Sequence, residues 1–115
     1  MLKGNRGEWS EVYAFLRILA DGEIKPSDAN LNELGNEPAI PVIRVIREEK
    51  GAPRVSYYVG DLMRAELDGG ETVAEVETDR LAREAASLYR EITSAGHAKG
   101  AFAVPLTEEF MDELG

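Results

Sequence analysis

The stretch from residue 40 to residue 77 contains four segments with the pattern of β-strands, and this feature constrains the fold most strongly. The first segment is dense in β-branched residues, and the third alternates Met63, Ala65 and Leu67 with charged residues. Because strands joined by short turns pair antiparallel, the sequence predicts an antiparallel meander. The predicted strands are 40–48, 54–60, 63–67 and 72–77, and the turns are 49–53 and 68–70.

A helix is predicted before this meander, over residues 6–20. Its apolar side chains recur at the spacing of one helical stripe: Trp9, Val12, Tyr13, Leu16 and Leu19. Asn5 at the N-cap and Glu8 three residues later fit a capping box, in which both side chains satisfy backbone N–H groups. Gly22 suits the end of this helix, and the segment 23–38, with its prolines and asparagines, is predicted to be a loop.

A second helix is predicted after the meander, with Thr78 as its N-cap and Gly96 at its end. Its apolar stripe consists of Leu81, Ala85, Leu88, Tyr89 and Ile92. A short apolar stretch, 101–105, leads to a brief final helix that Thr107 is predicted to cap. The predicted fold class is α+β: an N-terminal helix, an antiparallel β-meander, a second long helix and a short C-terminal helix or tail. The brevity of the last helix leads us to expect that residues 1–115 are a single domain from the N-terminal part of a longer protein.

The composition is that of an ordinary globular domain with an acid excess. The chain has 115 residues, 43% of them hydrophobic, and a formal net charge of −9. The acid excess argues against general adhesion to nucleic acid, although a local basic patch is compatible with it. The absence of cysteine excludes disulfides, thiolate metal sites and a cysteine nucleophile. Neither a secretory signal nor an apolar run long enough to cross a bilayer is present, so we expect a cytoplasmic protein without a membrane partner.

The familiar catalytic motifs are missing from the sequence. The one histidine, His97, follows the predicted second helix, where a solvated turn residue explains it better than a metal ligand. Asp21, Glu23 and Lys25 match the acid and E-x-K pattern of a nuclease metal site, but the match is short and falls in or beside the predicted loop. These three residues leave open one alternative, a small nuclease that is complete within this chain.

Glu8 and Glu11 form the strongest candidate for a functional pair. Their i, i+3 spacing places both carboxylates on the side of the first helix that continues with Phe15 and Ile18. One explanation is structural, because acids in the first turn complement the helix dipole and Glu8 fits the capping box. The other explanation is a site for a hard cation, which binds oxygen ligands near a half-buried surface.

The residues around this pair suit the second explanation. Lys3 and Arg6 add positive charge next to the carboxylates. Gly4 and Gly7 would allow a phosphate backbone to approach the chain closely. The start of the first helix is therefore the best candidate site in the sequence.

A further pattern consists of three segments, at 4–24, 30–49 and 100–114. They contain GNRGEWSEVYAFLRILADGEI, then Asn30-Leu31 before the apolar IPVIRVIREE, and finally GAFAVPLTEEFMDEL. These segments resemble the N-terminal region of the HpaII-type type II restriction endonucleases, whose members begin with G-N-K-G-E-W-S-E, an apolar helix and a D-G turn. The basic third position of that motif is Arg6 in this chain. The resemblance covers nearly the whole chain and is most specific in the first segment.

The resemblance implies a site-specific deoxyribonuclease that cuts double-stranded DNA at the palindrome CCGG with Mg²⁺. In this family the nuclease core, which is similar to that of PD-(D/E)XK enzymes, follows the E-E-F-M helix, so this chain would be inactive without that core as its partner. Glu8 and Glu11 would act as catalytic carboxylates, with Glu8 as a metal ligand. The residues that would contact DNA, as members of the matching motif, are Lys3, Asn5, Arg6 and Trp9. A palindromic target would suggest a homodimer.

A different class of function also agrees with the residues: a freestanding acidic α+β module that binds another protein and has no catalytic activity. The continuation of the gene distinguishes the two interpretations. A longer reading frame with an acid and an S-x-K or E-x-K strand would support the nuclease. A stop codon after Gly115, with no nuclease gene nearby, would support the module.

Overall fold

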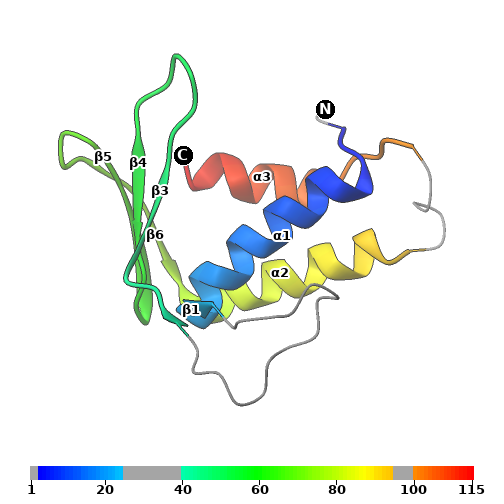
Figure 1. Ribbon diagram of the computed structural model, residues 1–115, viewed down its shortest axis with the longest axis horizontal. Helices are drawn as coiled ribbons and strands as arrows, with labels where there is room; N and C mark the ends of the chain where they lie inside the picture. Colours follow the sequence, from blue (N-terminus) through cyan, green and yellow to red (C-terminus); the bar gives the residue numbers. More distant parts are fainter. Residues whose placement is uncertain (1–2, 25–39, 95–99) are drawn as a thin grey trace.

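The computed structural model describes residues 3–24, 40–94 and 100–115, and it confirms the α+β class (Figure 1). The helices are α1 (Arg6–Asp21), α2 (Thr78–Ile92) and α3 (Pro105–Glu113). The strands are β1 (Glu23–Ile24), β2 (Ile40–Pro41), β3 (Arg44–Arg47), β4 (Val55–Tyr58), β5 (Leu62–Leu67) and β6 (Thr72–Glu77). No helix within these described ranges has the length and apolar character to cross a membrane.

The larger sheet has the strand order β3-β4-β5-β6 with every neighbouring pair antiparallel, so the predicted meander is confirmed. The single predicted strand over 40–48 is wrong, because it is interrupted at Val42 and Ile43. Its first part, β2, pairs with β1 in a separate two-stranded sheet, so residues 23 and 24 form a strand where the sequence predicts a loop. Pro41, which has no N–H to give to a ladder, stands at the end of β2, where the chain passes from one sheet to the other.

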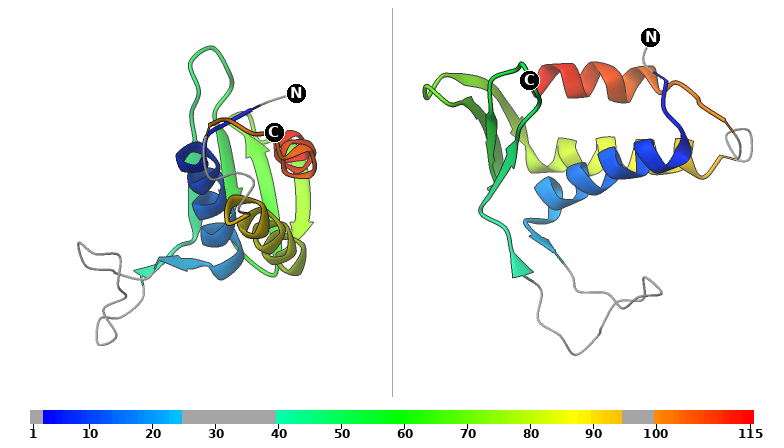
Figure 2. Two further views of the ribbon diagram at one scale, coloured as in Figure 1. Left: turned by 90° about the vertical axis from the view of Figure 1, so that its right-hand side faces the viewer. Right: turned by 45° about the horizontal axis from the view of Figure 1, so that its top comes forward.

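All three helices in the described part of the chain lie on one side of the four-stranded sheet (Figures 1 and 2). Alternate residues of each strand point toward the helices, and their side chains pack against the helices in the core. Phe15 of α1 packs edge-on against Tyr57 of β4, with 5.1 Å between the ring centroids. Tyr89, which the sequence places on the buried stripe of α2, is 53% exposed and contacts Tyr13. The larger buried apolar side chains are Trp9, Leu16, Leu19, Val55, Tyr57, Met63, Val76, Leu81, Leu88, Ile92, Phe102, Val104, Phe110 and Leu114.

The predicted ends of α1 are confirmed. The backbone N–H of Glu8 donates to Asn5 Oδ1 at 2.8 Å, and the Asn5 N–H donates to Glu8 Oε1 at 3.2 Å, which completes the capping box. Gly22 ends the helix with a φ of 67°, in the left-handed region that glycine adopts without strain. Gly96 and His97 lie outside the described residues.

Both threonine caps that the sequence predicts are wrong. Thr78 is the first residue of α2 and follows the N-cap Glu77. Its hydroxyl donates to the Asp61 carbonyl at 3.0 Å, so it ties the start of α2 to the residue before β5. Helix α3 begins at Pro105, before Thr107, because the fixed φ of proline suits the first helical position, where no N–H partner is needed. Thr107 is consequently inside the helix and buried.

The hydroxyl of Tyr57 is an unpaired polar group in the core. Tyr57 is 0% exposed, and its hydroxyl has no hydrogen-bond partner among the described residues. Because an unpaired buried hydroxyl costs free energy, Tyr57→Phe is expected to raise the free energy of unfolding by about 1 kcal/mol at neutral pH.

Burial also raises the pKa of the Tyr57 phenol, which gives this substitution a pH signature. The folded chain holds the phenolic proton more tightly than the unfolded chain, so the parent loses stability as the pH rises through about 10. The Phe variant is expected to lose less over the same range. Urea denaturation at neutral and alkaline pH measures both effects, and a variant that is less stable than the parent at neutral pH would contradict the assignment.

Candidate functional site

The start of α1 is held against the segment that precedes α3. Gly4 and Phe102 form an antiparallel bridge, in which the Gly4 N–H donates to the Phe102 carbonyl at 3.0 Å and the Phe102 N–H donates to the Gly4 carbonyl at 2.9 Å. The indole N–H of the buried Trp9 donates to the same Phe102 carbonyl at 2.9 Å. A Cβ atom at Gly4 would lie 3.3 Å from the indole nitrogen. Close packing at this junction therefore explains why glycine stands at position 4.

A hollow of about 240 Å³ opens beside this junction. It is lined by Lys3, Gly4, Glu8, Trp9, Glu11 and Val12. The structure thus brings Lys3, both candidate carboxylates and Trp9 to one place. Asn5 and Arg6 are exposed next to it, and the Asn5 side chain accepts the hydrogen bond of the capping box.

Glu8 and Glu11 are exposed along this hollow. One Glu8 oxygen accepts the Asn5 N–H, so the other oxygen faces no partner in the described part of the chain. Farther along the same side of α1, Phe15 packs against Tyr57 of the sheet. This side of the helix is therefore covered by the sheet at Phe15 and exposed at Glu11. Among the described residues, no three Asp, Glu, His or Cys side chains are grouped so as to hold a metal ion. Within the described ranges, the carboxylates that line this hollow are those of Glu8 and Glu11.

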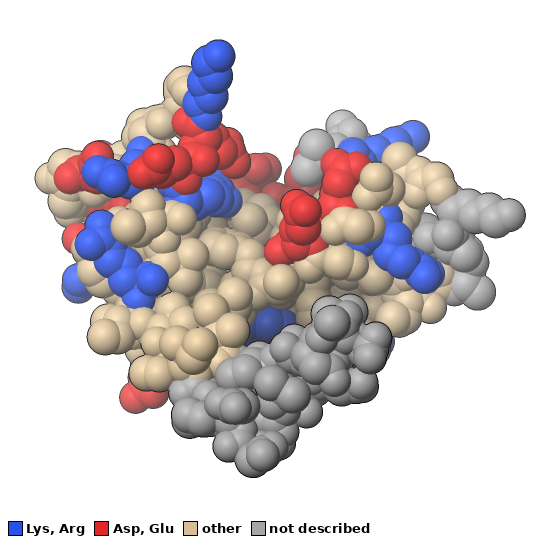
Figure 3. Space-filling model, in the orientation of Figure 1, with Lys and Arg blue, Asp and Glu red and all other residues tan. Residues whose placement is uncertain are grey.

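A second hollow, of about 480 Å³, adjoins the first, because Trp9 and Val12 line both. Its other lining residues are Arg47, Glu49, Glu108, Met111, Asp112 and Gly115. The floor is thus apolar in part, through Trp9, Val12 and Met111, and most of the charged residues around it are acidic. Figure 3 shows acidic side chains on both sides of a hollow in the middle of this face.

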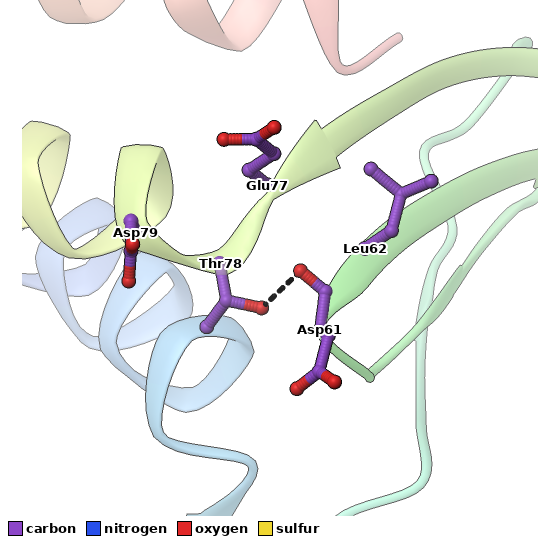
Figure 4. Close-up of a pocket in the computed structure, with 5 residues that line it drawn as sticks. All are labelled: Asp61, Leu62, Glu77, Thr78 and Asp79. Atoms are coloured by element: carbon purple, nitrogen blue, oxygen red, sulfur yellow. Dashed lines mark hydrogen bonds between the residues drawn. The ribbon is translucent and has the colours of Figure 1, made fainter.

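A third hollow, of about 470 Å³, lies where β6 meets α2 and does not gather its carboxylates at one point. It is lined by Asp61, Leu62, Glu77, Thr78 and Asp79 (Figure 4). The carboxylates of Asp61 and Glu77 point away from each other, and Thr78 is engaged with the Asp61 carbonyl. This arrangement offers no shared ligand position for a cation.

The residues of the E-x-K candidate, Asp21, Glu23 and Lys25, do not form a site in the described part of the chain. Asp21 forms an ion pair with Arg17 at 2.6 Å, and Glu23 belongs to β1. Lys25 lies outside the described residues. The described geometry therefore gives no support to the alternative of a small, complete nuclease.

Sequence reasoning missed the structural role of Trp9. The sequence places Trp9 on the apolar stripe of α1 and within the family motif, but its hydrogen-bond partner, Phe102, is 93 positions away. No pattern of neighbouring residues in the sequence predicts a hydrogen bond between such distant positions. The pairing depends on how α1 and the segment before α3 are brought together by the core.

The comparisons with known proteins identify the family to which the chain is similar. The family model described as HpaII restriction endonuclease matches residues 5–115. The type II restriction enzyme HpaII of Haemophilus parainfluenzae is 31% identical over 112 residues, which cover 97% of this chain. The chain spans 30% of the length of that curated relative. No solved structure matches the chain.

The matched range includes the capping box, Trp9 and its partner Phe102, the meander and α3, so the similarity extends over every described helix and strand. A match of this extent, together with the identity to a curated member, establishes common descent rather than a shared short motif. The chain belongs to the HpaII restriction endonuclease family.

Proposed function

We propose that this chain is the N-terminal part of a type II restriction endonuclease that cleaves double-stranded DNA at CCGG. The observation that carries the proposal is the family match over residues 5–115. The matched relative is named a type II restriction enzyme, and it is long enough to contain a separate nuclease core beyond the matched region. Such an enzyme meets its DNA in the cytoplasm, where we place this protein.

Glu8 and Glu11 are the residues of this part that would hold Mg²⁺. Carboxylate oxygens are the ligands that Mg²⁺ prefers, and one Glu8 oxygen is not used by the capping box. An octahedral Mg²⁺ takes six ligands, so water molecules, an oxygen of the DNA phosphate and groups of the nuclease core would supply the others. When bound, Mg²⁺ would polarise the phosphate that is cleaved.

The basic residues of the motif would contact the DNA backbone next to these carboxylates. Lys3 and Arg6 are exposed at the start of α1, where phosphate contacts could set the position of the duplex. Asn5 would contribute by fixing the first turn of α1, and the buried Trp9 by fixing the chain that enters it. Both would therefore act on DNA through the shape of the site.

The second hollow, between α1 and α3, would be the contact surface for the nuclease core. Its mostly acidic surroundings repel a DNA backbone, whereas its apolar floor suits a protein surface with basic residues. A palindromic target would be read by two copies of the enzyme related by two-fold symmetry. We therefore propose a homodimer as the active assembly.

The isolated chain, residues 1–115, is expected to leave DNA intact. A plasmid with CCGG sites, incubated with the chain and Mg²⁺, should stay supercoiled on an agarose gel, because the ligands of the core are missing. The complete gene product that contains this chain should give discrete CCGG fragments. A plasmid without CCGG sites and a reaction with a chelator are the controls.

Two results would overturn the proposal in different ways. Specific, magnesium-dependent fragments from repurified residues 1–115 would show that the catalytic site is complete within this chain. A complete gene product that folds but neither binds nor cuts DNA would favour the freestanding interaction module.

A further inference from the structure

The face of the four-stranded sheet that points away from the helices carries a row of three side chains across its strands. Arg44 of β3 pairs in register with Tyr58 of β4, and Tyr58 pairs with Arg64 of β5. Their sequence neighbours Val45, Tyr57, Met63 and Ala65 point toward the helices, so these three point outward. The guanidinium carbons of Arg44 and Arg64 lie 5.5 Å and 5.4 Å from the centroid of the Tyr58 ring. We refer to these residues as the Arg44–Tyr58–Arg64 row.

The guanidinium of Arg44 is held in place on one edge and open on another. Its Nε and Nη2 atoms donate to Ser56 Oγ at 3.2 Å and 2.9 Å. A guanidinium has five N–H donors, so the edge formed by Nη1 and the second hydrogen of Nη2 is left for another acceptor. The structure gives Arg44 no ion pair within the described ranges, although it is exposed. Arg44 is thus a preoriented cation for which the described residues provide no counter-charge.

The neighbouring arginines differ from Arg44 in this respect. Arg64 forms an ion pair with Glu66 at 3.1 Å. Arg54, on the β3–β4 hairpin, is paired with Asp68 at 3.1 Å and with Glu48 at 3.2 Å. Of these three arginines, Arg44 has the most to gain from an external anion.

We propose that the Arg44–Tyr58–Arg64 row binds a phosphate of the DNA backbone, with Arg44 as the principal contact. This inference rests on the proposed function, since it takes double-stranded DNA as the partner. Two planar N–H donors on one edge match two phosphate oxygens, and such charge-assisted pairs are stronger than neutral ones. The Tyr58 ring contacts both guanidinium groups, and because Arg64 is already paired with Glu66, the free edge of Arg44 makes the phosphate contact.

The charges around the row set the direction from which DNA approaches. Glu66, Glu75 and Glu77 lie toward β5 and β6, where they repel a phosphate backbone. The β3 and β4 side carries Arg44, Ser56 and Tyr58 instead. Figure 3 shows both signs of charge at the left, where Figure 1 places this sheet, with a group of Lys and Arg side chains among uncharged residues below the acidic ones. The duplex would therefore cross the sheet over β3 and β4.

Arg44→Gln in the complete gene product tests this assignment. Binding is measured by fluorescence anisotropy at several salt concentrations, with a CCGG duplex and with a duplex of scrambled sequence, and Ca²⁺ replaces Mg²⁺ to prevent cleavage. The variant is expected to bind both duplexes about tenfold more weakly and to lower the slope of log K against log salt by about 1, as for the loss of one phosphate contact. In cleavage assays with Mg²⁺, KM should rise while kcat stays near that of the parent.

Arg54→Gln is the matched control, because it removes the same charge from the same hairpin where two carboxylates already pair with it. It is expected to keep the affinity and salt slope of the parent. Equal behaviour of Arg44→Gln and the parent, in a protein that binds DNA, would overturn the inference and leave the proposed function intact. A loss confined to the CCGG duplex would also overturn it, since that pattern belongs to a base contact. If the parent binds no duplex, the proposed function and this inference both fail.

Discussion

Replacement of Trp9 by alanine is expected to lower the free energy of unfolding of this chain by about 3–5 kcal/mol, the range for a buried aromatic residue. Trp9 is 3% exposed, packs near Phe102 with 6.4 Å between ring centroids, and donates its indole N–H to the Phe102 carbonyl. The substitution removes apolar contacts and leaves space between α1 and the segment before α3. Since small domains are stable by only about 5–15 kcal/mol, a loss of this size is a large share of the total.

The hydrogen bond and the packing of Trp9 can be separated by a second variant. Trp9→Phe keeps an aromatic ring but removes the N–H, so it is expected to lower the free energy of unfolding less than Trp9→Ala does. The difference between the two variants measures the contribution of the retained ring. Urea denaturation, followed by far-UV circular dichroism, measures both variants. Leu106→Ala, at an apolar position of α3 that is 68% exposed, is the control and should change stability by less than about 0.5 kcal/mol. If Trp9→Ala lowered the free energy of unfolding no more than Leu106→Ala, the contacts between Trp9 and Phe102 would not stabilise the fold.

Local patterns predicted most of the architecture. The capping box of α1 involves Asn5 and Glu8 only, so its signal is complete within one helical turn. The turn after β5, with Asp68-Gly69-Gly70, likewise depends on neighbours in sequence. The meander follows from alternating strands with short connections. Each of these features is set by interactions between residues that are close along the chain.

The errors come from places where a tertiary contact replaces the local rule. Thr78 has the right residue type for a cap, but its hydroxyl is used by the carbonyl of Asp61. Thr107 also has the right type, but Pro105 starts the helix earlier. The stretch 40–48 has uniform strand propensity, and its break is decided by β1, which takes β2 into another sheet. Propensity cannot show such competition between partners.

The candidate site was accessible to sequence reasoning only in part. The i, i+3 spacing places Glu8 and Glu11 on one side of a helix whatever the rest of the fold does. The hollow beside them is different, because it is also lined by Gly4, which is bridged to Phe102, a residue far along the chain. The Arg44–Tyr58–Arg64 row depends on the register of three strands, which the sequence alone does not specify.

Glu8→Gln in the complete gene product is expected to reduce DNA cleavage at limiting Mg²⁺ by two orders of magnitude or more, while the fold stays close to that of the parent. A neutral amide oxygen is a poorer ligand for Mg²⁺ than a carboxylate, so the loss of one charged ligand should weaken the metal site. Cleavage of a CCGG plasmid, measured over a range of Mg²⁺ concentrations, should show a shift of the activation curve to higher Mg²⁺ as well as the lower rate.

The capping box makes this substitution informative. Glu8 accepts the Asn5 N–H through one side-chain oxygen, and the amide oxygen of glutamine can accept the same hydrogen bond. The loss of negative charge at the start of the helix costs at most about 1 kcal/mol at an exposed position. A structural role alone therefore predicts nearly unchanged cleavage, whereas a metal-binding role predicts its loss. The two explanations of Glu8 thus predict different cleavage rates for the Glu8→Gln variant but the same stability.

Glu71→Gln is the control for the change of net charge. Glu71 is exposed in the turn between β5 and β6, away from the start of α1, and its backbone carbonyl rather than its side chain accepts the Leu67 N–H. This variant is expected to cleave DNA like the parent at every Mg²⁺ concentration. Cleavage by Glu8→Gln equal to that of the parent at limiting Mg²⁺ would assign Glu8 to the capping box alone, and Glu11→Gln would then test the remaining carboxylate of the pair.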